Sequence, residues 1–202
     1  MLSVSMTLVL IAIISVASFV ALNNRKFYDA WILNPYRMED KKEYYRFLTS
    51  GLIHANFMHW FFNMFTFYFA ASNIEYNIGG WHLLAILLLG IVLSDFPSFT
   101  KHRKDRGYRS LGASGGVAAV MFAFIMIQPV TTIRVFFIPM PAFVFGGLFL
   151  LYSYYQGKSE SGDNVNHSAH FYGAVVGIVY ILVLYPFTIV TFFEQLMSWR
   201  IF

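Results

Sequence analysis

The stretch Arg109-Ser110-Leu111-Gly112-Ala113-Ser114-Gly115-Gly116 joins a charged loop to an apolar run that continues to Ile127. Ser114 therefore lies at the mouth of an expected membrane helix, between glycines that let other backbone or a bound molecule approach its hydroxyl. The first turn of a helix carries free N–H groups and the positive end of the helix dipole. A serine oxygen beside such donors suits acyl transfer, provided that the fold brings a base to it.

The composition is that of an integral membrane protein. Of the 202 residues 58% are hydrophobic, 20% are aromatic and only 12% are charged, whereas a soluble domain carries about 25% charged residues. The net charge of +4 is modest and comes from two loops, which argues against nucleic-acid binding. The chain has no cysteine, which excludes disulfides, thiolate metal sites and a cysteine nucleophile.

We predict a single six-helix membrane domain over residues 1–202. Its first apolar run is long enough to cross a bilayer, and we prefer a span to a cleaved signal peptide because no Lys or Arg precedes it. The following loop, to about Ala55, mixes charged and aromatic residues, as suits a segment at the membrane interface. Pro186 is expected to kink or end the last span. The spans are expected near residues 4–22, 57–77, 81–94, 112–128, 135–155 and 168–193.

Six spans place the loops after the first, third and fifth on one side of the membrane. Ser114 opens the fourth span on that side. The polar beginnings of the second and sixth spans lie on the same side. Residues from three different spans can therefore meet at one depth, whichever side is outside.

The sixth span offers a base for Ser114. His170, Gly173 and Gly177 are three and four residues apart, so they form one stripe of a helix whose glycines permit close approach. The small residues after Gly112 form a matching surface on the fourth span. If these faces pack, His170 comes near Ser114 as a nucleophile–base pair. The alternative is that His170 only donates a hydrogen bond between helices.

No acid is well placed to orient His170. Asp163 lies in the polar loop before the sixth span, and Asp95 ends the third span. A Ser–His dyad therefore fits better than a triad, although neither acid is excluded.

Polar residues also begin the second span. His59 and Asn63 are four residues apart on one face, where both can donate hydrogen bonds to a developing oxyanion or, alternatively, join two helices. His54 lies five residues before His59, roughly 140° round a helix, so we expect it to face elsewhere and to hydrogen-bond the first loop. Glu75, near the far end of this span, is expected to be structural, pairing with backbone or water.

These residues together resemble the rhomboid family of intramembrane serine proteases, with matches spread over most of the chain. Each motif alone is weak, but all of them stand in the family's order on the expected spans. The matching motifs are Tyr45-Arg46 in the first loop, His-xxxx-His-xxx-Asn at His54, His59 and Asn63, Glu75 on the second span, Gly-x-Ser-Gly at Gly112–Gly115, and Ala-His-xx-Gly-xxx-Gly at Ala169–Gly177.

The resemblance implies an all-α fold, a six-helix rhomboid-like bundle with a short central fourth helix and a water-filled cavity above the serine. It also implies an endopeptidase that needs no cofactor or metal and cleaves single-pass transmembrane substrates near the membrane face. Ser114 would be the nucleophile and His170 the general base and then acid. The oxyanion and substrate-stabilising groups would be His59, Asn63, Gly112 and the Ser114 N–H. The fifth helix and residues 156–166 would act as gate and cap, and the supporting residues would be His54, Tyr45, Arg46, Glu75, Gly173 and Gly177.

The sequence departs from the family pattern at two positions. Tyr45 stands where the family usually has Trp. Many bacterial members have a Tyr that stacks on the histidine one turn after the serine. Here that position is Ala118, so another residue must hold the His170 ring; Tyr172 or Phe122 could do so, and the sequence does not decide.

Orientation is a third conflict. The family's active site faces the extracytoplasmic side, which in a bacterial inner membrane would carry most of this chain's Lys and Arg residues. The positive-inside rule predicts the reverse. We follow the family, because its catalytic side is tied to the fold.

Two other classes of function compete with the protease. One is an inactive rhomboid relative that binds transmembrane helices for trafficking or quality control, although such relatives usually lack the serine or the histidine. The other is a histidine-box metalloenzyme, suggested by the pairs His54/His59 and His167/His170. Membrane di-metal enzymes need more converging ligands than the six histidines here supply, and an HExxH motif is absent. Expected partners are membrane lipids and transmembrane substrates; the oligomeric state is left open.

Overall fold

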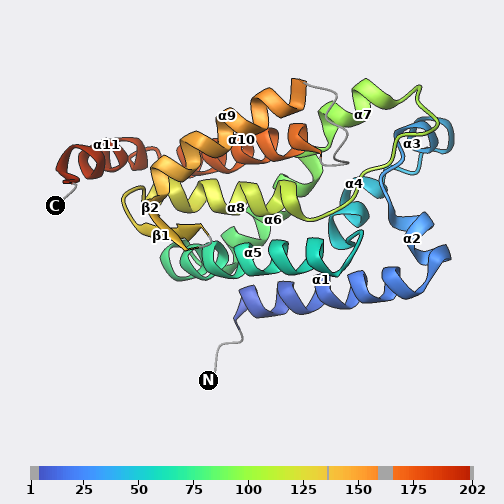
Figure 1. The fold of residues 1–202 in the computed structure, drawn as a ribbon, viewed down its shortest axis with the longest axis horizontal. Coiled ribbons are helices and arrows are strands. Elements are labelled where there is room, and N and C mark those ends of the chain that lie inside the picture. The colour runs from blue at the N-terminus through green and yellow to red at the C-terminus, as the bar shows by residue number, and fades with distance from the viewer. Residues whose placement is uncertain (1–4, 136, 159–165, 201–202) are drawn as a thin grey trace.

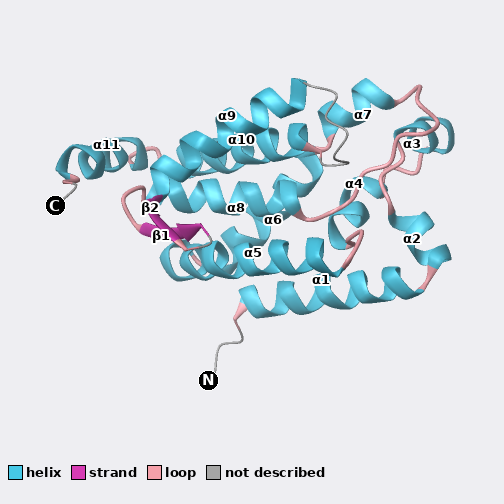
Figure 2. Ribbon diagram, viewed as in Figure 1, coloured by secondary structure: helices cyan, strands magenta, loops and turns pink. Residues whose placement is uncertain are grey.

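The computed structural model describes residues 5–135, 137–158 and 166–200, and shows a helical bundle with one short β-hairpin (Figures 1 and 2). The predicted all-α, polytopic membrane fold is confirmed. Three helical segments, Met6–Asn23, Gly80–His102 and His167–Leu184, are long and apolar enough to cross a membrane by length and composition alone. Within the described ranges the bundle consists of α1 (Met6–Asn23), α5 (Phe57–Ile78), α6 (Gly80–Ser94), α8 (Ser114–Ile127), α9 (Ala142–Lys158) and α10 (His167–Leu184).

Helix α8 is the centre of the bundle and contacts α5, α6, α9 and α10. It is apolar on all sides, as expected of a helix surrounded by others, and 11 of its 14 residues are buried. It begins at Ser114 rather than at the predicted residue 112. Gly112 has φ +121°, a backbone conformation that a right-handed helix cannot contain.

Small residues bring the neighbouring helices into backbone contact with α8. A Cβ built on Gly90 of α6 would lie 2.8 Å from Gly116 Cα. On the other side, a Cβ on Gly177 of α10 would lie 2.8 Å from the Ala119 carbonyl carbon. The predicted packing of the small faces of the fourth and sixth spans is therefore present in the structure.

The predicted fifth span, 135–155, is shifted. Its first residues belong to an antiparallel hairpin of β1 (Thr132–Val135) and β2 (Ile138–Pro141), and α9 begins only at Ala142. Pro139 and Pro141 explain the shift, because a proline inside a helix removes a hydrogen bond and clashes with the preceding turn. The hairpin lies beside the C-terminal end of α8 (Figure 2).

The predicted sixth span, 168–193, is two helices. Helix α10 ends at Leu184, and α11 (Thr188–Ser198) starts after Pro186, which stops the helix as expected. Helix α11 has no buried residue and projects from the end of the bundle (Figure 1). It is tied back by Gln195 Nε2, which donates to the carbonyl of Ile127 at the end of α8, 3.1 Å away.

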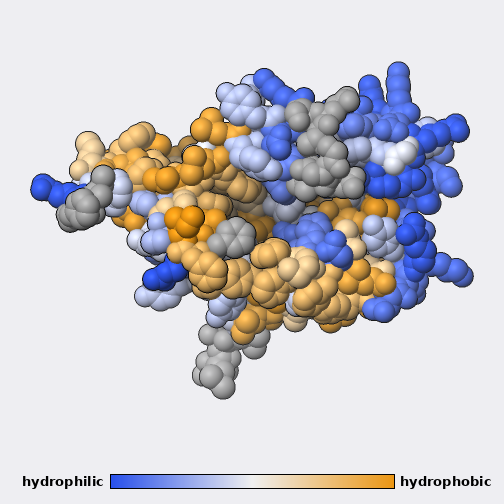
Figure 3. Space-filling view, viewed as in Figure 1, coloured by the Kyte–Doolittle hydropathy of each residue, from blue (hydrophilic) through white to orange (hydrophobic). Residues whose placement is uncertain are grey.

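The first loop, expected as an interfacial segment, is folded into short helices. These gather with α7 at one end of the bundle, where hydrophilic residues dominate the surface, while apolar side chains cover most of the rest of the visible face (Figure 3). This division is typical of a membrane protein with one polar end. The short helices are α2 (Arg25–Trp31), α3 (Pro35–Lys41), α4 (Arg46–Thr49), the 3₁₀ turn η1 (Ser50–Leu52) and α7 (Phe96–His102).

Candidate active site

A cavity of about 830 Å³ brings together the residues that the sequence nominated for chemistry. They come from α8, its preceding loop, α10 and α5, and they meet although they are far apart along the chain. The cavity is lined by Ser114, His170, His59, Asn63 and Gly112, among others.

Ser114 is the first residue of α8 and follows a loop whose backbone is held at several points. The Gly112 N–H donates to the carbonyl of Ser50, 2.9 Å away, and Ser110 forms an isolated β-bridge with Leu33. The first bond of the helix runs from Val117 N–H to Ala113 O. The N–H group of Ser114 therefore belongs to the open, electropositive end of the helix, where it can stabilise negative charge.

Gly112 and His59 are in direct contact. A Cβ on Gly112 would lie 2.6 Å from His59 Cε1 and 2.8 Å from its Nε2. Only glycine fits here, because the position combines a positive φ with an imidazole ring packed against the α-carbon. The His59 ring is thereby held against Gly112, which lies two residues before Ser114 in the chain.

The first turns of α5 position His59 and Asn63 at the cavity. Asn56 caps this helix by accepting a hydrogen bond from the His59 N–H at 2.8 Å. The amide nitrogen of Asn63 donates to the His59 carbonyl at 3.0 Å. A primary amide carries two N–H groups. The second N–H of Asn63 can therefore donate a hydrogen bond to a group in the cavity that this side chain lines.

His170 lies in the first turn of α10, whose N-cap is Asn166. Its ring is stacked on Phe149 of α9, with centroids 6.0 Å apart and planes at 27°. Of the two residues that could hold this ring, Tyr172 is 42% exposed, and Phe122 packs on Phe149. Nothing in the sequence singles out Phe149, because it is one aromatic residue among several on α9.

His54 does not face away from His59 as expected. Their rings meet edge to face with centroids 4.9 Å apart, because His54 precedes the helix and the helical angle does not apply to it. It is fully buried. Its Nδ1 lies 2.8 Å from Ser18 Oγ, which donates to the Leu52 carbonyl, while its Nε2 accepts from the Ala113 N–H at 3.5 Å.

These contacts require a neutral His54 ring with the proton on Nδ1. Burial, reinforced by the charge that His59 can carry, lowers the His54 pKa to about 3. His54 thus joins α1 to the residue just before Ser114.

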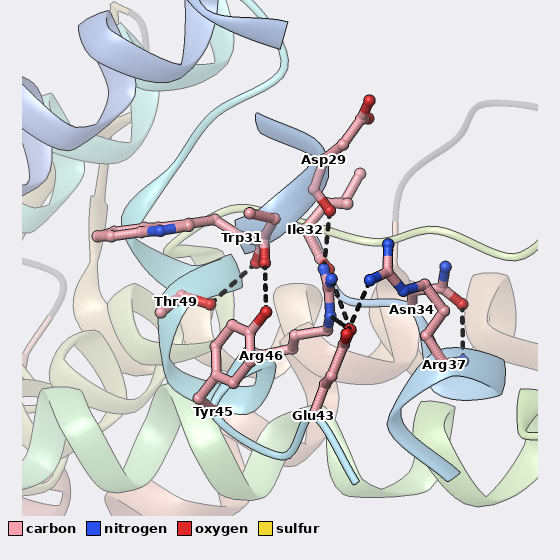
Figure 4. A network of polar contacts seen from close by, with 10 residues as sticks. Asp29, Trp31, Ile32, Asn34, Arg37, Glu43, Tyr45, Arg46 and Thr49 are labelled. Carbon is pink, nitrogen blue, oxygen red and sulfur yellow. Dashed lines mark hydrogen bonds and ion pairs between the residues drawn. The ribbon is translucent and has the colours of Figure 1, made fainter. Parts of the chain in front are cut away.

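The pair Tyr45-Arg46 organises the first loop (Figure 4). The Arg46 side chain is fully buried, ion-paired with Glu43 at 2.7 Å, and donates to the carbonyls of Asp29 and Ile32. The Tyr45 hydroxyl donates to the carbonyl of Ala30 at 3.1 Å.

The Glu43 carboxylate in Figure 4 forms ion pairs with both Arg37 and Arg46. Partial burial acts to raise its pKa. Hydrogen bonds from Arg37 and Arg46 outweigh burial and hold the pKa below its ordinary value.

Glu75 lies far from the cavity and binds the start of α1. Its carboxylate accepts from the backbone N–H groups of Met6 at 2.6 Å and Thr7 at 2.9 Å, and from the hydroxyls of Ser5 and Thr7. A carboxylate at a helix N-terminus satisfies free N–H groups and favours the dipole.

The two acids considered for a triad have different outcomes. Asp163 lies outside the described residues. Asp95 is buried, lines the cavity, and accepts hydrogen bonds from Ser50 Oγ at 3.5 Å and Asn166 Nδ2 at 3.4 Å.

Comparison with known proteins gives a family match and several relatives. The family model described as Rhomboid domain matches residues 41–187. RHOMBOID-like protein 12, mitochondrial, of Arabidopsis thaliana is 30% identical over 148 residues, which is 65% of this chain and 44% of the relative. The human Presenilin-associated rhomboid-like protein, mitochondrial, is 29% identical over 137 residues, 66% of this chain and 36% of the relative. This chain thus spans less than half the length of either relative.

Proposed function

Because this chain belongs to the rhomboid family, we propose that it is an intramembrane serine endopeptidase that works by a dyad of Ser114 and His170. The observation that carries the proposal is that both residues line one cavity together with His59 and Asn63. The cavity wall also includes Tyr28, Asp95 and Arg109 from the polar end of the bundle, and in the proposal water enters from this end.

In the proposed reaction, Ser114 Oγ attacks the carbonyl carbon of the scissile peptide bond and His170 takes the hydroxyl proton. The oxyanion that forms would accept hydrogen bonds from His59, Asn63 and the Ser114 N–H. His170 then gives its proton to the leaving amine as the C–N bond breaks. A water molecule, deprotonated by His170, hydrolyses the acyl-enzyme and frees Ser114.

The proposed substrates are single-pass transmembrane segments. Helix α9, proposed as the gate, buries only Ala142, Gly146 and Ser153 among its described residues, and it contributes Phe145 and Phe149 to the cavity wall. A helix held by so few buried side chains suits lateral movement. Of the proposed cap, residues 156–166, the part 159–165 lies outside the described residues.

The protein is a multi-pass integral membrane protein. We propose that the cavity opens to the extracytoplasmic side, as the resemblance implied. The expectation of a bacterial inner membrane is not supported by the named relatives, which are mitochondrial proteins.

Reaction with a fluorophosphonate tests the proposal, since this probe reacts with an activated serine. Wild type should be labelled, and Ser114→Ala and His170→Ala should not, while all three proteins unfold at similar temperatures. Ser114→Ala should also abolish cleavage of a single-span substrate. Cleavage by the Ser114→Ala protein would contradict the serine mechanism. A folded wild type that neither reacts nor cleaves would favour the inactive, helix-binding relative.

Two further measurements address the neighbouring hypotheses. Cleavage should resist EDTA; loss of activity on chelation and recovery with zinc would favour a metalloenzyme. Asn63→Ala should reduce kcat more than it changes KM, because an oxyanion donor acts in the transition state. An unchanged kcat would remove Asn63 from the site.

A further inference from the structure

Asn166 joins the beginnings of the two helices that carry the proposed dyad. Its Oδ1 caps α10 by accepting from the Ala169 N–H at 3.1 Å. Its Nδ2 donates to Ser110 Oγ, in the loop before α8, at 3.2 Å. One side chain therefore completes the first turn of α10 and binds that turn to the approach to Ser114.

The spacing of these residues is the same on both sides. Ser110 precedes Ser114 by four residues, and Asn166 precedes His170 by four residues. On the inner side of the dyad, Gly173 is packed against Gly115. Ser114 and His170 are thus bracketed by two attachments between their segments, one through a hydrogen bond and one through backbone contact.

The outer attachment rests on a fixed support. Ser110 exchanges two backbone hydrogen bonds with Leu33, of 3.0 and 3.2 Å. Asn166 Nδ2 also lies 3.0 Å from Ser98 Oγ of α7 and 3.4 Å from the buried carboxylate of Asp95. The amide therefore lies among three acceptors from two segments, the start of α7 and the loop before α8, both outside α10.

We propose that Asn166 is a positioning residue, which holds His170 in register with Ser114 by joining α10 to the loop that precedes Ser114. This inference rests on the proposed protease function. Without the bond to Ser110, the first turn of α10 would lose this attachment to the loop before Ser114, and terminal turns fray readily. A misplacement of about 1 Å can cost about 100-fold in rate.

The variant Asn166→Ser separates bridging from capping. Serine is a good N-cap and keeps an acceptor for the Ala169 N–H, but it is too short to reach Ser98 or Ser110. We expect kcat and the rate of fluorophosphonate labelling to fall about 10- to 100-fold, with KM within about twofold and an unfolding temperature near that of wild type. Ser110→Ala should lower kcat in the same way, and the double variant should be no slower than Asn166→Ser alone.

Asn24→Ser is the matched control. Asn24 caps α2 by accepting from the Phe27 N–H at 3.1 Å on an exposed surface, so the same exchange should leave kcat unchanged. The proposal is overturned if Asn166→Ser keeps the wild-type kcat or if Asn24→Ser lowers kcat as much. It is also overturned if the losses in kcat of Asn166→Ser and Ser110→Ala multiply in the double variant. Should Asn166→Ser fail to fold, Ser110→Ala alone decides. Absence of labelling in wild type would instead overturn the protease proposal, whatever the Asn166 variants do.

Discussion

Gly173 of α10 lies directly against Gly115 of α8: a Cβ on Gly173 would be 2.9 Å from the Gly115 carbonyl carbon and still nearer its oxygen. Gly177 repeats this contact one turn later against Ala119. Gly173 follows His170 by three residues, and Gly115 is next to Ser114. Backbone contact between the two helices therefore sets how closely the proposed base approaches the proposed nucleophile.

We expect Gly173→Ala to separate α10 from α8 and to reduce both activity and stability. The new methyl group has no space, and such overpacking costs about 1–3 kcal/mol. Gly147→Ala is the control, because a Cβ on Gly147 meets nothing within 4 Å. Unfolding temperature and kcat should fall in the first variant and stay near wild type in the second. Equal behaviour of the two variants would contradict the contact.

Gly112→Ala should lose turnover as well as stability. Its Cβ would displace the His59 ring, and its φ of +121° strains any L-residue. Gly79→Ala separates these effects, since Gly79 has φ +97° but no atom within 4 Å of a Cβ. Gly79→Ala should lower only the unfolding temperature, while Gly112→Ala should also lower kcat. A wild-type kcat in Gly112→Ala, measured on folded protein, would remove the His59 contact from the mechanism.

Phe149→Leu should lower kcat because it removes the ring stacked on His170 while keeping an apolar side chain. Ring pairs contribute about 0.5–1.5 kcal/mol beyond area burial, equivalent to about 2- to 12-fold in rate. Tyr172→Leu, at an exposed position that could also have held His170, should leave kcat unchanged. The assignment fails if Tyr172→Leu is the slower enzyme.

Acidification should destabilise the protein partly through His54. An unfolded chain protonates this histidine near pH 6.5, whereas the folded protein does so only near its lowered pKa of about 3. The contribution to stability is therefore complete above pH 6.5 and is lost progressively as the pH falls towards 3. Between pH 6.5 and 5 the loss from one such group is about 2 kcal/mol.

The variant His54→Gln tests this dependence, because it can still accept the Ala113 N–H but does not titrate. Unfolding temperatures at pH 7.5 and pH 5 should differ less for the variant than for wild type. The same difference in both proteins would show that His54 is not the group responsible.

Residue patterns were a good guide where a local rule decides the structure. The Gly-spaced stripe of His170 indicated the α8–α10 contact, and Pro186 indicated the end of α10. Hydropathy alone predicts a fifth span that begins at residue 135, but the helix begins only at Ala142. Pro139 and Pro141 lack N–H groups, which favours the edge of a hairpin over a helix. The helical angle between His54 and His59 predicts that they face apart. That angle does not apply, because His54 precedes α5, which begins at Phe57.

By itself, the sequence determined that this is a multi-pass helical membrane protein and nominated the side chains proposed for its chemistry, because hydropathy and short-range spacing act along the chain. Only the tertiary structure decided that Phe149 stacks on His170, that Gly112 makes room for His59, and that Asn166 joins the start of α10 to the loop before Ser114. These contacts join residues that are tens of positions apart. Their partners are ordinary phenylalanines, serines and glycines, and only the packing of α8 among its neighbours selects them.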